Sequence, residues 1–403
     1  MTQLATMTMM AGTTADGHYA NGLANGDKKS VNKFYETVND SEDTLNNNNY
    51  EGKSRLNSKK SDQSEYDRRG GDSATSDEKD YIYFGIKFKQ PLKVVNAISI
   101  IGFHLVSLYA FVLNFRSPHF LTVLWAFLVG GIGGFGVTAG AHRLWSHRSY
   151  KAKTPLRVLL ALCFSVAGQN TLYDWTRDHR VHHKFSETDA DPHNSNRGFF
   201  FAHVGWLMMR KHPDVIRKGN QVDMSDILAD PVVQWHQKYF VTLKLLLCFL
   251  IPTAVPIYFW NEEWLISIFT LSFIRYVFAL NFTWLVNSAA HMWGNRPFDR
   301  KINPAENLSV SIVSMGEGWH NYHHTFPWDY KAAEIGDFRY NLTTTFLNLF
   351  AKIGWAYDLK EPSKELIRKT IERHGDGSHS KHGERCMPDE VPMEADENSN
   401  LIE

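Results

Sequence analysis

The feature that most constrains this chain is a pair of long apolar segments that carry no charged side chain. Residues 94–115 and 119–141 contain no Asp, Glu, Lys or Arg, and only three residues separate them. Each segment is long enough to cross the roughly 30 Å hydrocarbon core of a bilayer as a helix. Buried helices of a large soluble protein are the alternative, but two such uninterrupted runs in tandem favour a membrane hairpin.

Two further segments predict a second hairpin. Residues 240–260 contain one lysine, Lys244, and residues 264–287 contain one arginine, Arg275. Because a charge in lipid is costly, we expect Arg275 to face the protein interior or a polar cavity. A shorter apolar run at 156–168 predicts a cap or interfacial helix rather than a span.

Basic residues gather at one end of each predicted span. They are Lys87, Lys89, Lys93, Arg143, Arg148, Lys151, Lys153, Lys238, Arg296, Arg300 and Lys301. The two short turns at the other end hold only Arg116 and the acidic pair Glu262 and Glu263. The positive-inside rule then places both termini and residues 142–239 in the cytosol. The predicted fold class is an all-α integral membrane protein, with four transmembrane helices in two hairpins and a cytosolic helical cap.

The two ends of the chain differ from its middle. Residues 1–80 hold too few apolar side chains to offset the entropy of ordering, which predicts a disordered cytosolic tail. The start of this segment has no basic region followed by an apolar core, so no cleavable signal peptide is predicted there. Residues 81–372 are the predicted membrane domain, and residues 373–403 a flexible cytosolic tail.

Charge and cysteine usage exclude several classes of function. The 43 Lys and Arg residues balance 43 Asp and Glu residues, so no electrostatic case exists for a nucleic-acid partner. The three cysteines, Cys163, Cys248 and Cys386, are scattered. This spacing excludes a disulfide framework and a cysteine-based metal site.

Histidine is the unusual residue of this chain. Nine of the 19 histidines fall in four places, all at or beyond the predicted cytosolic ends of the spans: His142, His147, His179, His182, His183, His291, His320, His323 and His324. Offsets of three and four residues share a helix face, so each triplet is predicted to direct three imidazoles one way. His142 and His147, five residues apart, are predicted to diverge toward two different ions.

The number and type of these side chains predict a metal centre. Imidazole suits iron, zinc and copper, and nine histidines are too many for one ion but enough for two. Only one Glu-x-x-His spacing occurs, from Glu317 to His320, so a ferritin-like carboxylate centre is not indicated. We therefore predict an all-nitrogen dinuclear centre, and a redox role favours iron because zinc has no accessible second oxidation state. For a single isolated histidine such as His291, a structural role is the better reading.

Four motifs resemble the histidine boxes of the membrane acyl-CoA desaturases. They are Gly140-Ala-His142-Arg-Leu-Trp-Ser-His147, Asp178-His179-Arg-Val-His182-His183-Lys-Phe-Ser-Glu187, Asn287-Ser-Ala-Ala-His291 and Glu317-Gly-Trp-His320-Asn-Tyr-His323-His324. The resemblance is strongest to the animal stearoyl-CoA (delta-9) group, insect members included, and runs from about residue 82 to about residue 360.

The resemblance implies a helical enzyme of the endoplasmic reticulum membrane. Such an enzyme uses O2, with electrons from cytochrome b5 and its reductase, to place a cis double bond in a saturated long-chain fatty acyl-CoA. It also implies that the nine histidines hold two iron ions (Fe2+), and that Asn287 reaches one of them through a water molecule. No catalytic residue beyond these metal ligands is implied.

Substrate contacts are implied by the same resemblance. Gln169, Trp175 and Thr283 are expected to hold the bend of the acyl chain, and further contacts to acyl-CoA are expected from Asn96, Asn170, Arg177, Asp178, Arg210 and Lys211. The alkyl chain itself needs a narrow apolar tunnel. Tryptophans near the boxes are candidates to line it: Trp145, Trp175, Trp284, Trp293 and Trp319. Gly130 and Gly134, just before the first box, leave room at the tunnel end.

Other functions remain open at this point. The same iron centre suits a delta-11 desaturase, another regiochemistry or a fatty acyl hydroxylase. A non-catalytic metal-binding membrane protein, such as a zinc transporter, is the alternative from another class. A transporter would place its ionisable ligands at mid-bilayer depth, whereas these histidines lie at or beyond the cytosolic ends of the spans.

Overall fold

The computed structural model describes residues 81–83, 86–88, 90–114, 118–334 and 340–379. The predicted tail at 1–80 and residues 380–403 of the predicted C-terminal tail lie outside these ranges. The predicted start of that tail, residue 373, falls inside helix α18 (Lys364–His374). Beyond the helix, the Asp376 N–H still donates to the Arg296 carbonyl at 3.1 Å. Ordered contacts therefore continue past the predicted boundary.

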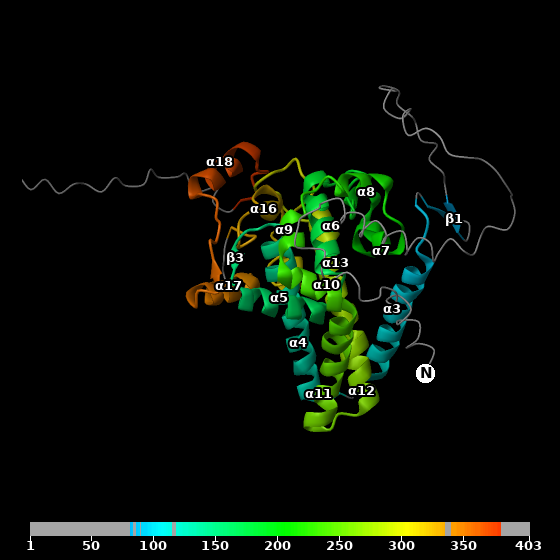
Figure 1. Cartoon of the computed structure of the whole chain (residues 1–403). Helices are drawn as coiled ribbons and strands as arrows, with labels where there is room; N and C mark the ends of the chain where they lie inside the picture. Colours follow the sequence, from blue (N-terminus) through cyan, green and yellow to red (C-terminus); the bar gives the residue numbers. More distant parts are fainter. Residues whose placement is uncertain (1–80, 84–85, 89, 115–117, 335–339, 380–403) are drawn as a thin grey trace, which may run out of the picture. The chain divides into compact units, whose positions relative to one another are not determined.

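Within the described ranges, four helical segments are long and apolar enough to cross a membrane, which confirms the predicted spans. The second helix continues past Ala141 to Ser146, and the third begins at Pro231, so both extend beyond their predicted cytosolic ends. In Figure 1 the turn between α11 and α12 lies at one end of the bundle, and α6, α8 and α16 lie at the other. The four spans comprise α3 (Val94–Asn114); α4 (Phe120–Phe135) and η1 (Gly136–Ser146); α10 (Pro231–Leu243), η4 (Lys244–Leu250) and α11 (Ile251–Trp260); and α12 (Trp264–Ile268), η5 (Phe269–Ile274), α13 (Arg275–Asn287) and α14 (Ala289–Met292).

The remaining elements build the cap and its connections. The helices are α5 (Thr154–Ala167), α6 (Leu172–Phe185), η2 (Ser195–Arg197), η3 (Phe201–Gly205), α7 (Trp206–Met208), α8 (Pro213–Gly219), α9 (Ser225–Ala229), α15 (Leu308–Val313), α16 (His320–Thr325), α17 (Leu342–Lys352) and α18. Two short antiparallel strand pairs complete the described part: β1 (Tyr81–Tyr83) with β2 (Ile86–Phe88), and β3 (Lys151–Ala152) with β4 (Ala356–Tyr357).

Helix α5 is the predicted short apolar helix at 156–168. It ends at Ala167 and is capped by Gly168, whose φ of 64° is left-handed, and the chain then turns by 86° into α6. Leu156 and Phe164 on α5 are fully buried. At Gly136 an added Cβ would lie 2.1 Å from the Phe164 nitrogen, so η1 packs directly on the α5 backbone. This close packing carries the end of the second span into the cap.

Arg275 lies inside the protein, as predicted, with 6% of its surface exposed. Its Nε donates to the Leu271 carbonyl at 2.9 Å, and its Nη1 donates to the Val166 carbonyl at 3.3 Å. Its Nη2 also donates to the Cys248 carbonyl. Backbone carbonyls of three helices thus satisfy the guanidinium away from lipid.

Arg143 is one of the basic residues counted at the predicted cytosolic ends of the spans, and it is buried in the structure. Because the second helix continues to Ser146, Arg143 stays inside the protein and is 1% exposed. Its Nε and Nη2 donate to Glu317 Oε1 at 3.0 and 2.7 Å. It also donates to Thr344 Oγ1 at 2.9 Å, which ties η1 to α17.

Candidate metal centre

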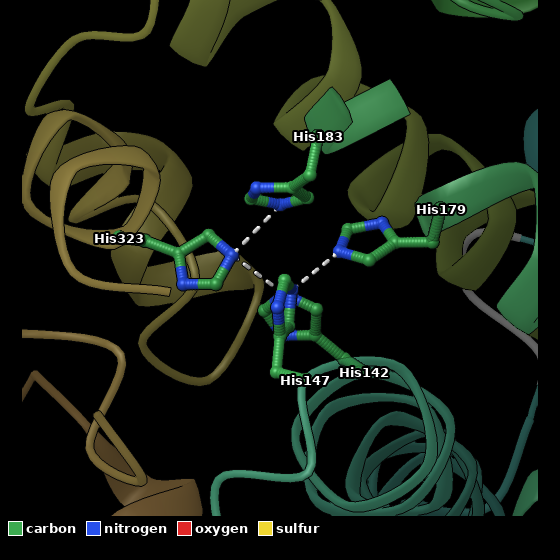
Figure 2. Close-up of side chains that lie close together, drawn as sticks. All are labelled: His142, His147, His179, His183 and His323. Carbon is green, nitrogen blue, oxygen red and sulfur yellow. Dashed lines mark hydrogen bonds between the residues drawn. The ribbon is translucent and has the colours of Figure 1, made fainter. Parts of the chain in front are cut away.

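The nine predicted histidines gather in two clusters. Within each cluster the candidate ligand nitrogens lie within 4.8 Å of one another. Figure 2 shows the rings of the first cluster converging on one point; they are carried by η1 and the residue directly after it, by α6 and by α16. Two clusters agree with the predicted dinuclear arrangement. We call them the five-histidine cluster (His142, His147, His179, His183 and His323) and the four-histidine cluster (His182, His291, His320 and His324).

Each histidine triplet is divided between the clusters, so the expectation that its three imidazoles point one way was wrong. On an α-helix, side chains four residues apart diverge by about 40°, and those three apart by about 60° in the opposite sense. His179 and His183 therefore stay together, while His182 turns to the other cluster. The second triplet divides in the same way, with His320 and His324 together and His323 apart.

His142 and His147 belong to one cluster, which corrects the expectation that they diverge. That expectation assumed α-helical geometry, but η1 is a π-helix. The His147 N–H donates to the His142 carbonyl at 3.1 Å, a bond between residues five apart. A π-helix brings such residues onto the same face. The wider turn is thus what delivers two ligands from one helix end to a single ion.

Carboxylates fix the orientation of three of the nine rings. In each case Nδ1 lies next to a carboxylate oxygen. For His182 and His291 the contact is a hydrogen bond, so Nδ1 carries the proton and Nε2 presents its lone pair to the cluster, whereas His142 and Glu317 meet as an ion pair without hydrogen-bond geometry. A histidine that binds a metal through one nitrogen usually donates the other N–H in this way. The three pairs are His142 with Glu317 at 2.8 Å, His182 with Asp191 at 2.8 Å, and His291 with Glu187 at 2.7 Å.

The inward-facing Nε2 atoms are arranged to bind a cation rather than to hydrogen-bond to one another. His147 Nε2 lies 2.8 Å from His179 Nε2, and His320 Nε2 lies 2.9 Å from His291 Nε2. The buried Nε2 of His182 has no hydrogen-bond partner among the described residues. Lone pairs that face each other at this range suit a shared positive ion. Each cluster can therefore hold a metal ion.

Burial favours the uncharged, metal-binding form of these imidazoles. Burial, followed by the charge of neighbouring imidazoles, holds the pKa values of His179 and His323 well below their usual range. Burial alone would raise the pKa of Glu317, but Arg143 and His142 lower it to about 2. His179 and His323 are thus neutral imidazoles, and Glu317 is an ionised carboxylate beside the same cluster. At His182, burial lowers the pKa but the Asp191 carboxylate outweighs it and raises the pKa.

Comparison with known proteins identifies the family. A sequence model of the family described as "Fatty acid desaturase" matches residues 118–337, more than half of the chain. The chain belongs to the fatty acid desaturase family.

Several desaturases with assigned names are similar to it. The chain is 58% identical over 297 residues to the acyl-CoA Delta-9 desaturase of Acheta domesticus, covering 73% of this chain and 83% of the relative. It is 51% identical over 293 residues to the acyl-CoA Delta(11) desaturase of Spodoptera littoralis, covering 73% and 86%. It is 53% identical over 275 residues to stearoyl-CoA desaturase 5 of Homo sapiens, covering 68% and 83%.

A cavity of about 1040 Å³ runs beside the metal centre of this desaturase. His142, His179 and His320 form part of its wall, so both clusters border the same space. Many of the predicted substrate residues and Asn287 also line it: Asn96, Gln169, Asn170, Trp175, Asp178, Thr283 and Asn287. Gly130 and Gly134 line it as well.

The three residues predicted to hold the acyl bend are bonded to one another. Trp175 Nε1 donates to Gln169 Oε1 at 2.8 Å, and Gln169 Nε2 donates to Thr283 Oγ1 at 3.0 Å. The Trp175 ring also stacks on His179, with centroids 5.0 Å apart. The chain of hydrogen bonds thus connects the cavity wall to a ring of the five-histidine cluster.

The predicted cationic residues lie outside the described lining of the cavity: Arg177, Arg210 and Lys211. Lys211 Nζ donates to both oxygens of Asp178, at 2.5 and 2.7 Å, so it sits directly behind a lining residue. Of the predicted tryptophans, Trp175 and Trp284 line the cavity, whereas Trp145, Trp293 and Trp319 are not among its described lining residues. Trp145 instead donates to Asp230 Oδ2 at 3.2 Å.

Spacing rules did not predict the carboxylates that support the histidines. Asp191 lies nine residues after His182 in an irregular loop, and no helical offset connects the two. Glu187 ends the second motif, yet it supports His291 on a distant segment. The available signal was the occurrence of carboxylates beside the histidine motifs.

Proposed function

We propose that this protein is an acyl-CoA desaturase that forms a cis double bond, at delta-9, in a saturated long-chain acyl-CoA. The observation that supports this proposal is that both histidine clusters form part of the wall of the same cavity. Both histidine clusters border one apolar cavity, in a chain that belongs to the fatty acid desaturase family. The enzymes of known regiochemistry that resemble it include delta-9 and delta-11 desaturases, so product analysis decides between these positions.

We infer that the metal ions are two Fe2+, held by the nine histidines, with Asn287 acting through a water molecule. Bound iron supplies the oxidising power that an unactivated methylene requires, because no acid–base group can remove its hydrogens. The reaction then balances as one O2, two protons and two electrons, plus two hydrogens from the acyl chain, giving two waters. Cytochrome b5 and its reductase are the proposed electron donors.

The protein's own residues place the acyl chain. The bonded set of Gln169, Trp175 and Thr283 is proposed to fix the bend beside the five-histidine cluster. An added Cβ at Gly130 would meet nothing within 4 Å, which supports room there for the end of the chain. The CoA portion is proposed to contact Asn96, Asn170, Arg177, Asp178, Arg210 and Lys211. Guanidinium and ammonium groups suit its phosphates.

The proposed location is the endoplasmic reticulum membrane, with four spans and both termini in the cytosol. The basic residues at the cap end of the spans support this orientation. Acyl-CoA and the electron donors would then reach the cap from the cytosolic side.

Expression in yeast that lacks its own desaturase tests the function. Gas chromatography–mass spectrometry with double-bond derivatisation should find new delta-9 monoenes, and purified protein should contain about two irons per chain. His182→Ala and His323→Ala, one from each cluster, should abolish the product and lower the iron content. His374→Ala, an exposed histidine at the end of α18, should do neither. Full activity in either cluster variant, or hydroxylated products only, would overturn the proposal.

A further inference from the structure

Two buried polar side chains on the cavity wall lack partners and belong to no predicted site. His193 is 6% exposed, and its Nδ1 has no hydrogen-bond partner among the described residues. Within the same part of the chain, the indole nitrogen of Trp206 is also buried and without a partner. Both residues line the cavity. Buried donors and acceptors are normally satisfied, so this pair indicates that something else binds there.

Neighbouring contacts hold the two rings against each other. The His193 N–H donates to Asp191 Oδ1 at 2.9 Å, the carboxylate that also faces His182. The rings of His193 and Trp206 meet edge to face, with centroids 4.3 Å apart. They therefore form one fixed polar site rather than two independent ones, and we call it the His193–Trp206 pair.

The pair lies beside the cytosolic start of the first span. The Lys93 N–H donates to the Met208 carbonyl at 2.7 Å, which anchors α7 to the start of α3. Asn96 donates to the carbonyl of Leu207, and both of these residues line the cavity next to Trp206. Asp178, another lining residue, holds Lys211 behind the wall. The pair thus stands near charged groups on one side and the apolar cavity on the other.

We propose that the His193–Trp206 pair binds the neutral amide and carbonyl groups of the pantetheine arm of the acyl-CoA. This inference rests on the proposed function. Between the phosphates and the alkyl chain, this arm offers uncharged polar groups: amide carbonyls, amide N–H groups, a hydroxyl and the thioester carbonyl. The Trp206 N–H donates to a carbonyl oxygen, and the imidazole of His193 accepts from an amide or donates to a carbonyl. The pair would therefore set how deeply the acyl chain enters the cavity.

Binding of stearoyl-CoA to the metal-loaded enzyme, without an electron donor, tests the inference. Trp206→Phe removes the N–H and keeps an aromatic ring, and should raise the Kd for stearoyl-CoA by about 3- to 10-fold. His193→Phe should do the same. Free stearate has no pantetheine arm, so its Kd should not change. The double variant should lose less than the product of the two single effects, because both residues contact one group.

The melting temperature of the ligand-free enzyme distinguishes this proposal from the alternative that an ordered water molecule satisfies the His193–Trp206 pair. Trp260, in the span helix beside the turn between α11 and α12, donates to Thr122 Oγ1 at 2.8 Å and provides the matched control. Trp260→Phe should lower the melting temperature of the ligand-free enzyme and leave the Kd unchanged. Trp206→Phe should leave that temperature unchanged, since no hydrogen bond within the protein is lost.

Two outcomes would overturn the inference or the function behind it. An unchanged stearoyl-CoA Kd in Trp206→Phe, together with a lowered ligand-free melting temperature, would mean that water satisfies the pair. An enzyme with both metals in place that binds no stearoyl-CoA would instead overturn the proposed function. The two failures are therefore distinguishable.

Discussion

The carboxylates behind the histidines differ in what they support. Glu317 faces His142 and also receives two hydrogen bonds from the buried Arg143. Glu187 faces His291 and forms no ion pair with an arginine in the described part of the chain. Its side chain is also more exposed, at 15% against 6%. Glu317 thus supports both a candidate metal ligand and the fold, while Glu187 supports a candidate metal ligand.

Substitution by glutamine should separate these roles. Glu187→Gln should weaken metal binding by about 10- to 100-fold, because the negative charge behind the His291 ring is lost and only a neutral amide faces it, and should change thermal stability little. Glu317→Gln should weaken metal binding similarly and also destabilise the fold by about 3–5 kcal/mol, because Arg143 loses its buried counter-ion. Metal titration and thermal unfolding of the same preparations provide the measurements. Wild-type metal affinity in both variants would contradict a supporting role for these carboxylates.

Between elements, a chain of polar side chains connects the first span to the helix that carries Asn287. His104 Nδ1 donates to the Ile100 carbonyl at 2.8 Å, so its Nε2 accepts from Asn281 Nδ2 at 3.0 Å. Asn281 Oδ1 in turn accepts from His203 Nε2 at 3.0 Å. The Ser288 hydroxyl lies 2.9 Å from His203 Nδ1, next to Asn287. One tautomer of each histidine satisfies all of these contacts. This series of hydrogen bonds therefore holds α3, η3 and the end of α13 in a fixed position relative to one another.

Asn281→Leu should remove the two central hydrogen bonds of this series, those to His104 and His203. The ring nitrogens of His104 and His203 would lose their shared partner, which should destabilise the protein by about 1–3 kcal/mol. Thermal unfolding in detergent measures the loss. The effect in a His203→Phe background should be smaller than in the wild type, because one of the two bonds is already absent. Equal effects in both backgrounds would show that the two residues act independently.

Among the elements, the membrane spans were the most predictable from sequence, because lipid restricts them most. A span must satisfy its own backbone inside lipid, so 94–115 and 264–287 could be identified from apolar length alone. The π-helix at η1 was not predictable in this way, because hydropathy does not distinguish five-residue from four-residue bonding. The contacts of Glu317 with His142, and of Asp191 with His182, depend on where separate segments meet in the fold. Spacing therefore identified the histidines but not their division between two clusters.

On the scale of the whole molecule, orientation in the membrane is the main expectation to test. Cys163 and Cys248 are buried, so Cys386→Ser, which removes the third cysteine, gives a variant with low background thiol labelling. In this background, Glu263→Cys in the turn between α11 and α12 should resist a membrane-impermeant maleimide in intact microsomes and react after permeabilisation. His374→Cys on α18 should react in both conditions. Labelling of Glu263→Cys in intact microsomes would reverse the proposed orientation.

The distribution of the histidines along the chain has a consequence for biogenesis. The five-histidine cluster takes four residues from the second-span and α6 region and His323 from the last triplet. The four-histidine cluster joins His182 of α6 to His291, His320 and His324, and the last triplet comes after the fourth span. A ribosome must therefore translate nearly the whole membrane domain before either cluster can be complete. Loading of the proposed metal ions then follows membrane insertion as a late maturation step. If these ions are the proposed iron, iron shortage should leave full-length, inserted but immature protein, which quality control can remove.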